Sequence, residues 1–168
     1  DIEETEKTLG FGMRADILAQ AEEICENFRK NRSTDMVVLR LDHLYCIPRD
    51  RKHVNNICAR MCLECLSEGY IKADTDHTFS LLFEKDAVEY IYKVVSTGKH
   101  EYSLYQLSSN DVVSELELAA MVQEHMADSA NIVTSSGGIG RCVLSGTRFE
   151  KEYGVHAFGD LNRNIEKM

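Results

Sequence analysis

The stretch Met36-Val37-Val38-Leu39-Arg40-Leu41 decides the fold class of this chain. It is nearly all apolar and contains β-branched residues, a composition typical of a strand covered on both faces. Such strands belong to parallel sheets, because the crossover helices of a parallel sheet lie on both of its faces. We therefore predict a parallel sheet that contains residues 36–41.

A helix over residues 14–30 is predicted before this strand. Its apolar residues recur at helical spacing and form one stripe: Ile17, Ala21, Ile24, Cys25 and Phe28. After the strand, Pro48 and a charged loop lead into a second predicted helix over residues 53–67, which Gly69 closes.

The remainder of the chain alternates between strands and helices. Ser114 and Glu117 have the spacing of a capping box, so a helix is predicted from there to about Met126. The other predicted strands are residues 79–83, 102–107, 131–133 and 142–144, and the other helices are 86–95, 147–153 and 160–167. Strands separated repeatedly by helices indicate the α/β class.

Composition excludes several kinds of partner and location. The 168 residues carry 19 Lys and Arg against 28 Asp and Glu, a net charge of -9, which argues against nucleic acid and against an anionic membrane surface. No apolar run approaches the roughly 20 residues that cross a bilayer. The six cysteines in a chain without a secretory signal are predicted to be reduced thiols, so we expect a cytoplasmic protein.

Five segments, in this order, carry a family resemblance. They are Val38-Leu39-Arg40-Leu41-Asp42-His43-Leu44-Tyr45-Cys46-Ile47-Pro48, Phe79-Ser80-Leu81-Leu82-Phe83-Glu84-Lys85-Asp86-Ala87-Val88, Tyr105-Gln106-Leu107-Ser108-Ser109, Val113-Ser114-Glu115-Leu116-Glu117-Leu118-Ala119 and Leu144-Ser145-Gly146-Thr147-Arg148-Phe149-Glu150-Lys151-Glu152-Tyr153-Gly154-Val155. Together they resemble the C-terminal, substrate-binding half of the extended short-chain dehydrogenase/reductases, the NAD-dependent epimerase/dehydratase family.

The resemblance implies a partial Rossmann-like parallel sheet with a small α/β substrate-binding lobe over residues 14–168. Residues 1–13 are expected to be an acidic, poorly ordered lead-in. It also implies NAD or NADP as the cofactor of the parent protein and a nucleotide sugar as ligand.

The glycine-rich turn that holds the dinucleotide in this family is missing from the chain. Its one glycine cluster, Ser135-Ser136-Gly137-Gly138-Ile139-Gly140, opens no periodic helix and is predicted to be a flexible loop. We therefore expect no cofactor in this chain.

The family's catalytic pair, Tyr-x-x-x-Lys, is also absent. Counting back from Glu22 as the family's helix glutamate places Arg14 and Leu18 at those positions, and a second register places Phe11 and Ala15 there. Neither pair supplies a phenol whose pKa a lysine lowers, so the chain is predicted to be catalytically silent.

Three residues are candidates for substrate binding by this resemblance. His43 stands where the family has an asparagine, and it is either an acid/base or a hydrogen-bonded structural histidine. Tyr45 matches the family's strand tyrosine, with a packing role as the alternative. Arg141 corresponds to a phosphate-facing arginine or is a plain surface residue. Phe79 replaces a further arginine that binds the diphosphate in the family.

Cys58, Cys62 and Cys65 share one face of the second predicted helix. Three thiols on one face suit a metal or redox site, but a second Cys or His pair at a defined spacing is lacking, and His53 and His77 are candidates by count only. We predict that the three thiols pack as small apolar side chains and that no metal is bound.

Two hypotheses about function follow. In the first, the chain is a fragment of an NAD(P)-dependent nucleotide-sugar enzyme whose dinucleotide-binding half is encoded upstream of Asp1. In the second, it is a degenerate binding or regulatory module that keeps the fold. A sheet without its first half exposes an apolar strand edge, so a homo-oligomer is predicted, with the helix over residues 14–30 at its interface.

Overall fold

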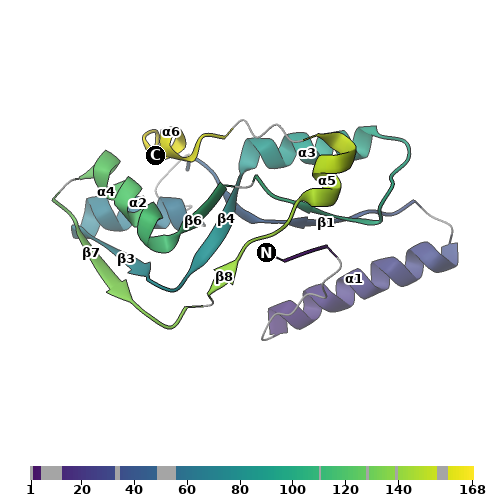
Figure 1. Ribbon diagram of the computed structural model, residues 1–168, viewed down its shortest axis with the longest axis horizontal. Helices are drawn as coiled ribbons and strands as arrows, with labels where there is room; N and C mark the ends of the chain where they lie inside the picture. Colours follow the sequence, from purple (N-terminus) through teal and green to yellow (C-terminus); the bar gives the residue numbers. More distant parts are fainter. Residues whose placement is uncertain are drawn as a thin grey trace.

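The computed structural model describes residues 2–4, 13–32, 35–48, 56–109, 111–127, 129–138, 140–154 and 159–168. The fold is a mixed α/β arrangement of three small sheets and six helices within these residues. Figure 1 shows a long part, built on strands β1 and β5, and a lobe at the opposite end that holds α2, α4, β3 and β7. The predicted lead-in lies mostly outside the described residues.

The predicted parallel strand is present. Strand β1 (Val38–Leu41) pairs in parallel with β5 (Leu104–Leu107), with Val38 opposite Leu104 and Leu41 opposite Leu107. The interpretation of residues 36–41 as covered on both faces was wrong, because none of them is buried and Leu41 is 39% exposed. Among the described residues β1 pairs with β5 alone, so its other edge has no neighbouring strand.

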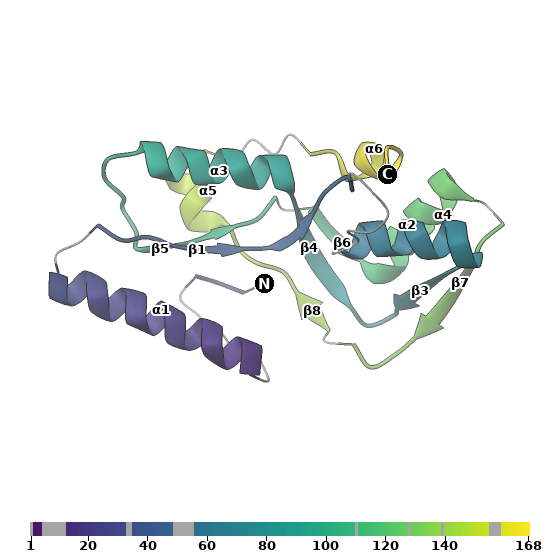
Figure 2. The same cartoon turned by 180° about the vertical axis from the view of Figure 1, so that it is seen from behind.

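Helix α1 (Met13–Arg32) and helices α3 (Glu84–Ser96) and α5 (Thr147–Tyr153) lie on opposite faces of the β1–β5 pair, as both views show (Figures 1 and 2). The face that α3 and α5 cover is packed tightly, through a cluster of buried residues that includes Tyr90, Tyr105 and Phe149. Helix α1 is different, since none of its 20 residues is buried. Four members of its predicted apolar stripe, Ile17, Ala21, Ile24 and Phe28, are exposed, and Cys25 is partly buried.

Strand β4 (Thr78–Phe83) joins the long part to the lobe. One of its edges pairs with β6 (Asp111–Ser114), antiparallel. Its other edge carries two strands end to end, both parallel: β8 (Arg141–Cys142) opposite Thr78 and Phe79, then β2 (His43–Tyr45) opposite residues 81–83. The chain therefore stops pairing with β5 at Leu41 and begins to pair with β4 at His43, two residues later.

The lobe is built from α2 (Ile57–Glu68), β3 (Tyr70–Asp74), α4 (Glu115–Met126), β7 (Asn131–Ser135) and α6 (Leu161–Ile165). β3 and β7 are parallel. Ser114 and Glu117 form the predicted capping box at the start of α4, and Gly69 ends α2 in a left-handed conformation with φ of 71°. Strands β2, β3 and β6 were not predicted, because each is short and only partly apolar.

The cysteines of α2 pack as predicted. Cys58, Cys62 and Cys65 are 0%, 5% and 3% exposed and belong to the apolar core of the lobe together with Met61, Ile71 and Leu118. No group of three or more metal-ligating side chains lies together in the described part of the chain. Within that part, no helix is long and apolar enough to cross a membrane.

Candidate functional site

A pocket of about 740 Å³ opens where β1 ends and β2 begins. Its wall comes from the N-terminal parts of α1 and α2 and from the junction of β1 and β2. The start of β4 and the end of β8 complete it. The lining residues are Arg14, Leu18, Leu41, Asp42, His43, Leu44, Asn56, Ile57, His77, Phe79, Cys142 and Leu144. The pocket thus brings together segments that are far apart in the sequence.

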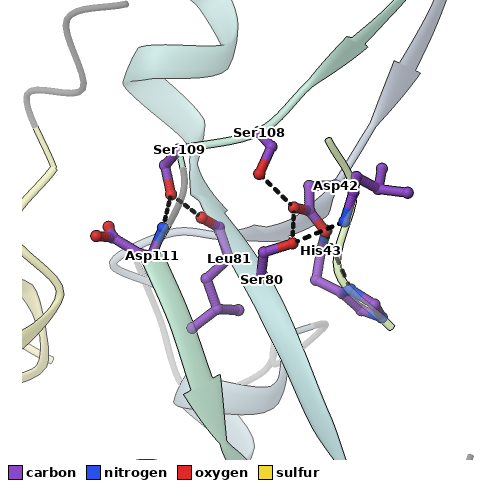
Figure 3. Close-up of polar contacts among 8 residues, drawn as sticks. Asp42, His43, Ser80, Leu81, Ser108, Ser109 and Asp111 are labelled. Atoms are coloured by element: carbon purple, nitrogen blue, oxygen red, sulfur yellow. Dashed lines mark hydrogen bonds and ion pairs between the residues drawn. The ribbon is translucent and has the colours of Figure 1, made fainter. Parts of the chain in front are cut away.

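Asp42, one of the lining residues, is the centre of a group of hydrogen bonds that Figure 3 shows. Its side chain is 1% exposed, and Oδ2 accepts hydrogen bonds from the hydroxyls of Ser80 and Ser108, the latter at 2.9 Å. Oδ1 accepts the backbone N–H of His43 at 2.8 Å. Three donors from three segments meet at one buried carboxyl, so Asp42 fastens the point at which the chain passes from β5 to β4.

His43 presents its side chain to the pocket. Its Nδ1 lies 3.3 Å from Asp42 Oδ1, and the side chain is 47% exposed. His43 is therefore a half-exposed histidine in the pocket wall and not a residue of the core, so its ring is accessible to a ligand.

A second histidine is held in the same way. Nδ1 of His77 lies 3.4 Å from Glu115 Oε2, which also accepts a hydrogen bond from the backbone N–H of Asp74. The other carboxylate oxygen, Oε1, accepts a hydrogen bond from Arg60 Nη2 at 3.0 Å. The His43 and His77 rings meet edge to face with centroids 6.4 Å apart. The pocket therefore contains two imidazoles, and Nδ1 of each ring faces a carboxylate.

Arg14 and Leu18 stand on successive turns of α1 and both line the pocket. These are the positions that the register counted from Glu22 assigns to the catalytic pair. The second register cannot be compared, because Phe11 lies outside the described residues. An arginine and a leucine provide no group that exchanges a proton near neutral pH.

The other two candidate residues lie away from the pocket wall. Tyr45 is 1% exposed, packs on Phe83 with ring centroids 5.2 Å apart, and accepts a hydrogen bond from Asn164 Nδ2 at 3.2 Å. Burial raises the pKa of its phenol to about 12. Arg141 is exposed on β8, next to Cys142 in the wall. The structure therefore brings only His43 of the three into the pocket.

Sequence reasoning missed Asp42, Ser80, Ser108, His77 and Glu115 as parts of one site. One signal was available for two of them. Asp42 and Ser108 follow directly after strands β1 and β5. The carboxyl ends of parallel strands meet at one edge of a sheet, which is where ligands bind in open α/β folds. Nothing local marked His77, which lies between β3 and β4 and whose partner Glu115 begins helix α4.

The described residues do not fit a dinucleotide cofactor. A dinucleotide cradle needs bare glycine backbone at a strand-to-helix turn. Here Gly137 and Gly140 have φ of 104° and 80°, but they lie between strands β7 and β8. We therefore derive no chemical step through NAD or NADP in this chain.

Several solved structures share this fold. UDP-glucuronic acid 4-epimerase from Bacillus cereus, solved with NAD, superposes with a TM-score of 0.80 at 15% identity and covers 99% of this chain. UDP-N-acetylglucosamine 4-epimerase from Methanobrevibacter ruminantium gives 0.82 at 12% identity over 99% of this chain, and dTDP-glucose 4,6-dehydratase from Bacillus anthracis gives 0.77 at 14% identity over 94%.

The chain spans about half the length of these proteins, namely 54%, 55% and 50% of each in turn. Its fold is thus the fold of part of a Rossmann-like epimerase or dehydratase, as the sequence resemblance implied. No protein-family model matches the sequence, and no curated protein matches it either.

Proposed function

We propose that this chain is the nucleotide-sugar-binding half of an NAD(P)-dependent epimerase/dehydratase-like protein, and that it binds such a ligand without converting it. The observation that carries the proposal is the composition of the 740 Å³ pocket. In the register counted from Glu22, Arg14 and Leu18 line it at the places of the family's phenol and ammonium, and His43, Asn56 and Ile57 line it as well. Binding groups are present, but the acid/base pair is not.

Two features support a nucleotide sugar as the ligand class. The solved structures that share the fold include complexes with UDP-glucuronic acid and with UDP-N-acetylmuramic acid. The pocket also combines apolar walls, Leu41 and Leu44, with polar groups that converge from several elements, as ligand pockets usually do.

Isothermal titration calorimetry of the chain with UDP-glucose, UDP-N-acetylglucosamine, UDP-glucuronic acid and dTDP-glucose tests the proposal. At least one should bind, and Leu18→Trp should abolish the binding by filling the pocket. Leu18 is 51% exposed, so the larger ring leaves the core intact. The matched control is Val88→Trp on α3, which is 67% exposed and outside the pocket. Absence of binding to every nucleotide sugar would refute the proposal.

The second part of the proposal concerns turnover. We expect no NADH formation or consumption when the chain is mixed with NAD(H) and a bound nucleotide sugar. Expressing the chain together with the sequence encoded upstream of Asp1 separates the two hypotheses. Turnover by that longer protein would favour an enzyme fragment, and persistent inactivity with ligand binding would favour a degenerate binding module.

We also propose that the chain forms a homo-oligomer through α1 and that it works in the cytoplasm. Ile17, Ile24 and Phe28 are 58%, 67% and 44% exposed along one face of α1, which is more apolar surface than a solvent-facing helix usually presents. The assignment to the cytoplasm rests on the composition, in which six cysteines are all free thiols.

A further inference from the structure

We infer that His43 and His77 form a pH-sensitive anion clamp that grips the diphosphate of a nucleotide sugar when the imidazoles are protonated. This inference rests on the proposed function, because it concerns the same pocket. It adds which groups bind the phosphates and under what condition they do so.

The first step is the orientation of the two rings. Nδ1 of His43 faces Asp42 at 3.3 Å, and Nδ1 of His77 faces Glu115 at 3.4 Å. Each carboxyl therefore occupies one ring nitrogen, which leaves Nε2 as the nitrogen that can donate to a ligand. Both histidines line the pocket, and within the described residues Nε2 of neither ring has a hydrogen-bond partner.

The second step is that the carboxyls are themselves held in place. Asp42 is fixed by Ser80 and Ser108, as Figure 3 shows, and Glu115 by Arg60 and the backbone of Asp74. An imidazole that turns one nitrogen to a fixed carboxyl is oriented before a ligand arrives.

The third step is the charge balance of the pocket. The chain carries a net charge of -9, which opposes a dianionic diphosphate. The charged and titratable groups around the pair are Asp42 and Glu115, Arg14 from α1, Arg60 from α2, and Cys142 and Arg141 from β8. Arg60 is engaged by Glu64 and Glu115. Protonation of two imidazoles is thus the available source of added positive charge in the wall.

The fourth step is reach. The two rings and Phe79 form a cluster with centroid separations of 6.4, 5.4 and 4.8 Å. Phe79 is 1% exposed and supports both imidazoles from below. The two imidazoles thus lie close enough together in the pocket wall to contact the same ligand.

Titration calorimetry with UDP-glucose at pH 6.0 and pH 8.0 tests the inference. Both phosphates of this diester stay ionised over that range, so a change in affinity reports on the protein. We expect the dissociation constant to be about tenfold lower at pH 6.0, which corresponds to about 1.4 kcal/mol. In His43→Gln together with His77→Gln this dependence should disappear, while His125→Gln, a histidine on α4 outside the pocket, should keep it.

Two further measurements separate clamping from a structural role. The double variant His43→Arg with His77→Arg should bind UDP-glucose with equal affinity at both pH values, because both guanidinium groups stay charged. In NMR spectra at pH 6.0, the imidazole signals of His43 and His77 should shift when UDP-glucose is added, and the signal of His125 should not. Thermal melting of each variant checks that it folds.

The outcomes are distinguishable. Binding that is equal at pH 6.0 and 8.0, or that keeps its pH dependence in the double variant, would overturn the clamp and leave the proposed function standing. Failure of UDP-glucose and of every other nucleotide sugar in the panel to bind at either pH would overturn the proposed function, and the clamp with it.

Discussion

Glu22 of α1 and Arg40 of β1 form a two-bonded ion pair, with Arg40 Nε and Nη2 each 2.8 Å from one carboxylate oxygen. The side chains are 25% and 16% exposed. The hydrogen bond to Glu22 raises the pKa of the Arg40 guanidinium. Since α1 buries no residue, this pair is the principal polar attachment of the helix to the sheet in the described part of the chain.

Glu22→Ala should therefore loosen α1 and lower the free energy of unfolding by about 2 kcal/mol, between the values for exposed and buried ion pairs. Urea denaturation followed by circular dichroism measures this. Glu23→Ala is the matched control, because Glu23 is an exposed neighbour on the same helix. Equal stability of the two variants would show that the pair contributes nothing.

Asp42→Asn should be among the most destabilising polar substitutions in the chain. The amide nitrogen cannot accept from Ser80 or Ser108, so a buried donor is left without a partner, at a cost of about 3 kcal/mol. Ser108→Ala should cost about 1 kcal/mol. Asp35→Asn, at an exposed position before β1, serves as control, and a melting temperature of Asp42→Asn equal to that of the control would contradict the structure.

Cys58 should contribute stability that depends on pH. Burial raises the pKa of this thiol from 9.0 to about 12. The folded state thus favours the protonated thiol, so the contribution is complete below about pH 9 and is lost as the pH rises toward 12. We expect Cys58→Val to show a shallower loss of stability over that range than the natural chain, measured by chemical denaturation at a series of pH values.

The same burial should protect Cys58 and Cys62 from alkylation. At pH 8, iodoacetamide should label Cys25, which is partly exposed on α1, while Cys58 and Cys62 react only in urea. Mass spectrometry of tryptic peptides measures the extent at each site. Rapid labelling of Cys58 in the native protein would mean that α2 is not packed as described.

The capping box of α4 should be sensitive to both of its members. Ser114→Ala removes the acceptor of Glu117 N and should cost about 1 kcal/mol. Hydrogen bonds from the Ser114 backbone and hydroxyl lower the pKa of Glu117. The stability that Glu117 adds over Glu117→Gln is therefore present near neutral pH and is lost as the pH falls through its lowered pKa. Thermal melts at pH 7 and pH 3 test this sign.

Disruption of the α1 stripe should produce a monomer. Ile24→Asp places a charge among Ile17, Ile24 and Phe28 without touching the core, since Ile24 is 67% exposed. Sedimentation velocity should show an oligomer for the natural chain and for the control Val88→Asp on α3, and a monomer for Ile24→Asp. A natural chain that is monomeric at high concentration would rule out this interface.

Local patterns were sufficient to predict several elements of this protein. The apolar stripe of α1, the Ser114–Glu117 box and the α5 segment depend on residues within a few positions of one another, so periodicity and end signals identified them. The two strands β1 and β5 and their parallel direction were also predicted, because both are apolar and helices separate them in the sequence, but their pairing with each other was not. The fold class could be read in this way.

The site was decided by the tertiary structure. Asp42 meets Ser80 and Ser108, and His77 meets Glu115, across stretches of chain that no local pattern connects. The alternatives that the sequence left open for His43 and Tyr45 depend on burial, and burial depends on where β2 lies along β4: it places His43 in the pocket wall and Tyr45 in the core. Sequence period determines which face a side chain takes, but only the packing of distant segments determines what that face meets.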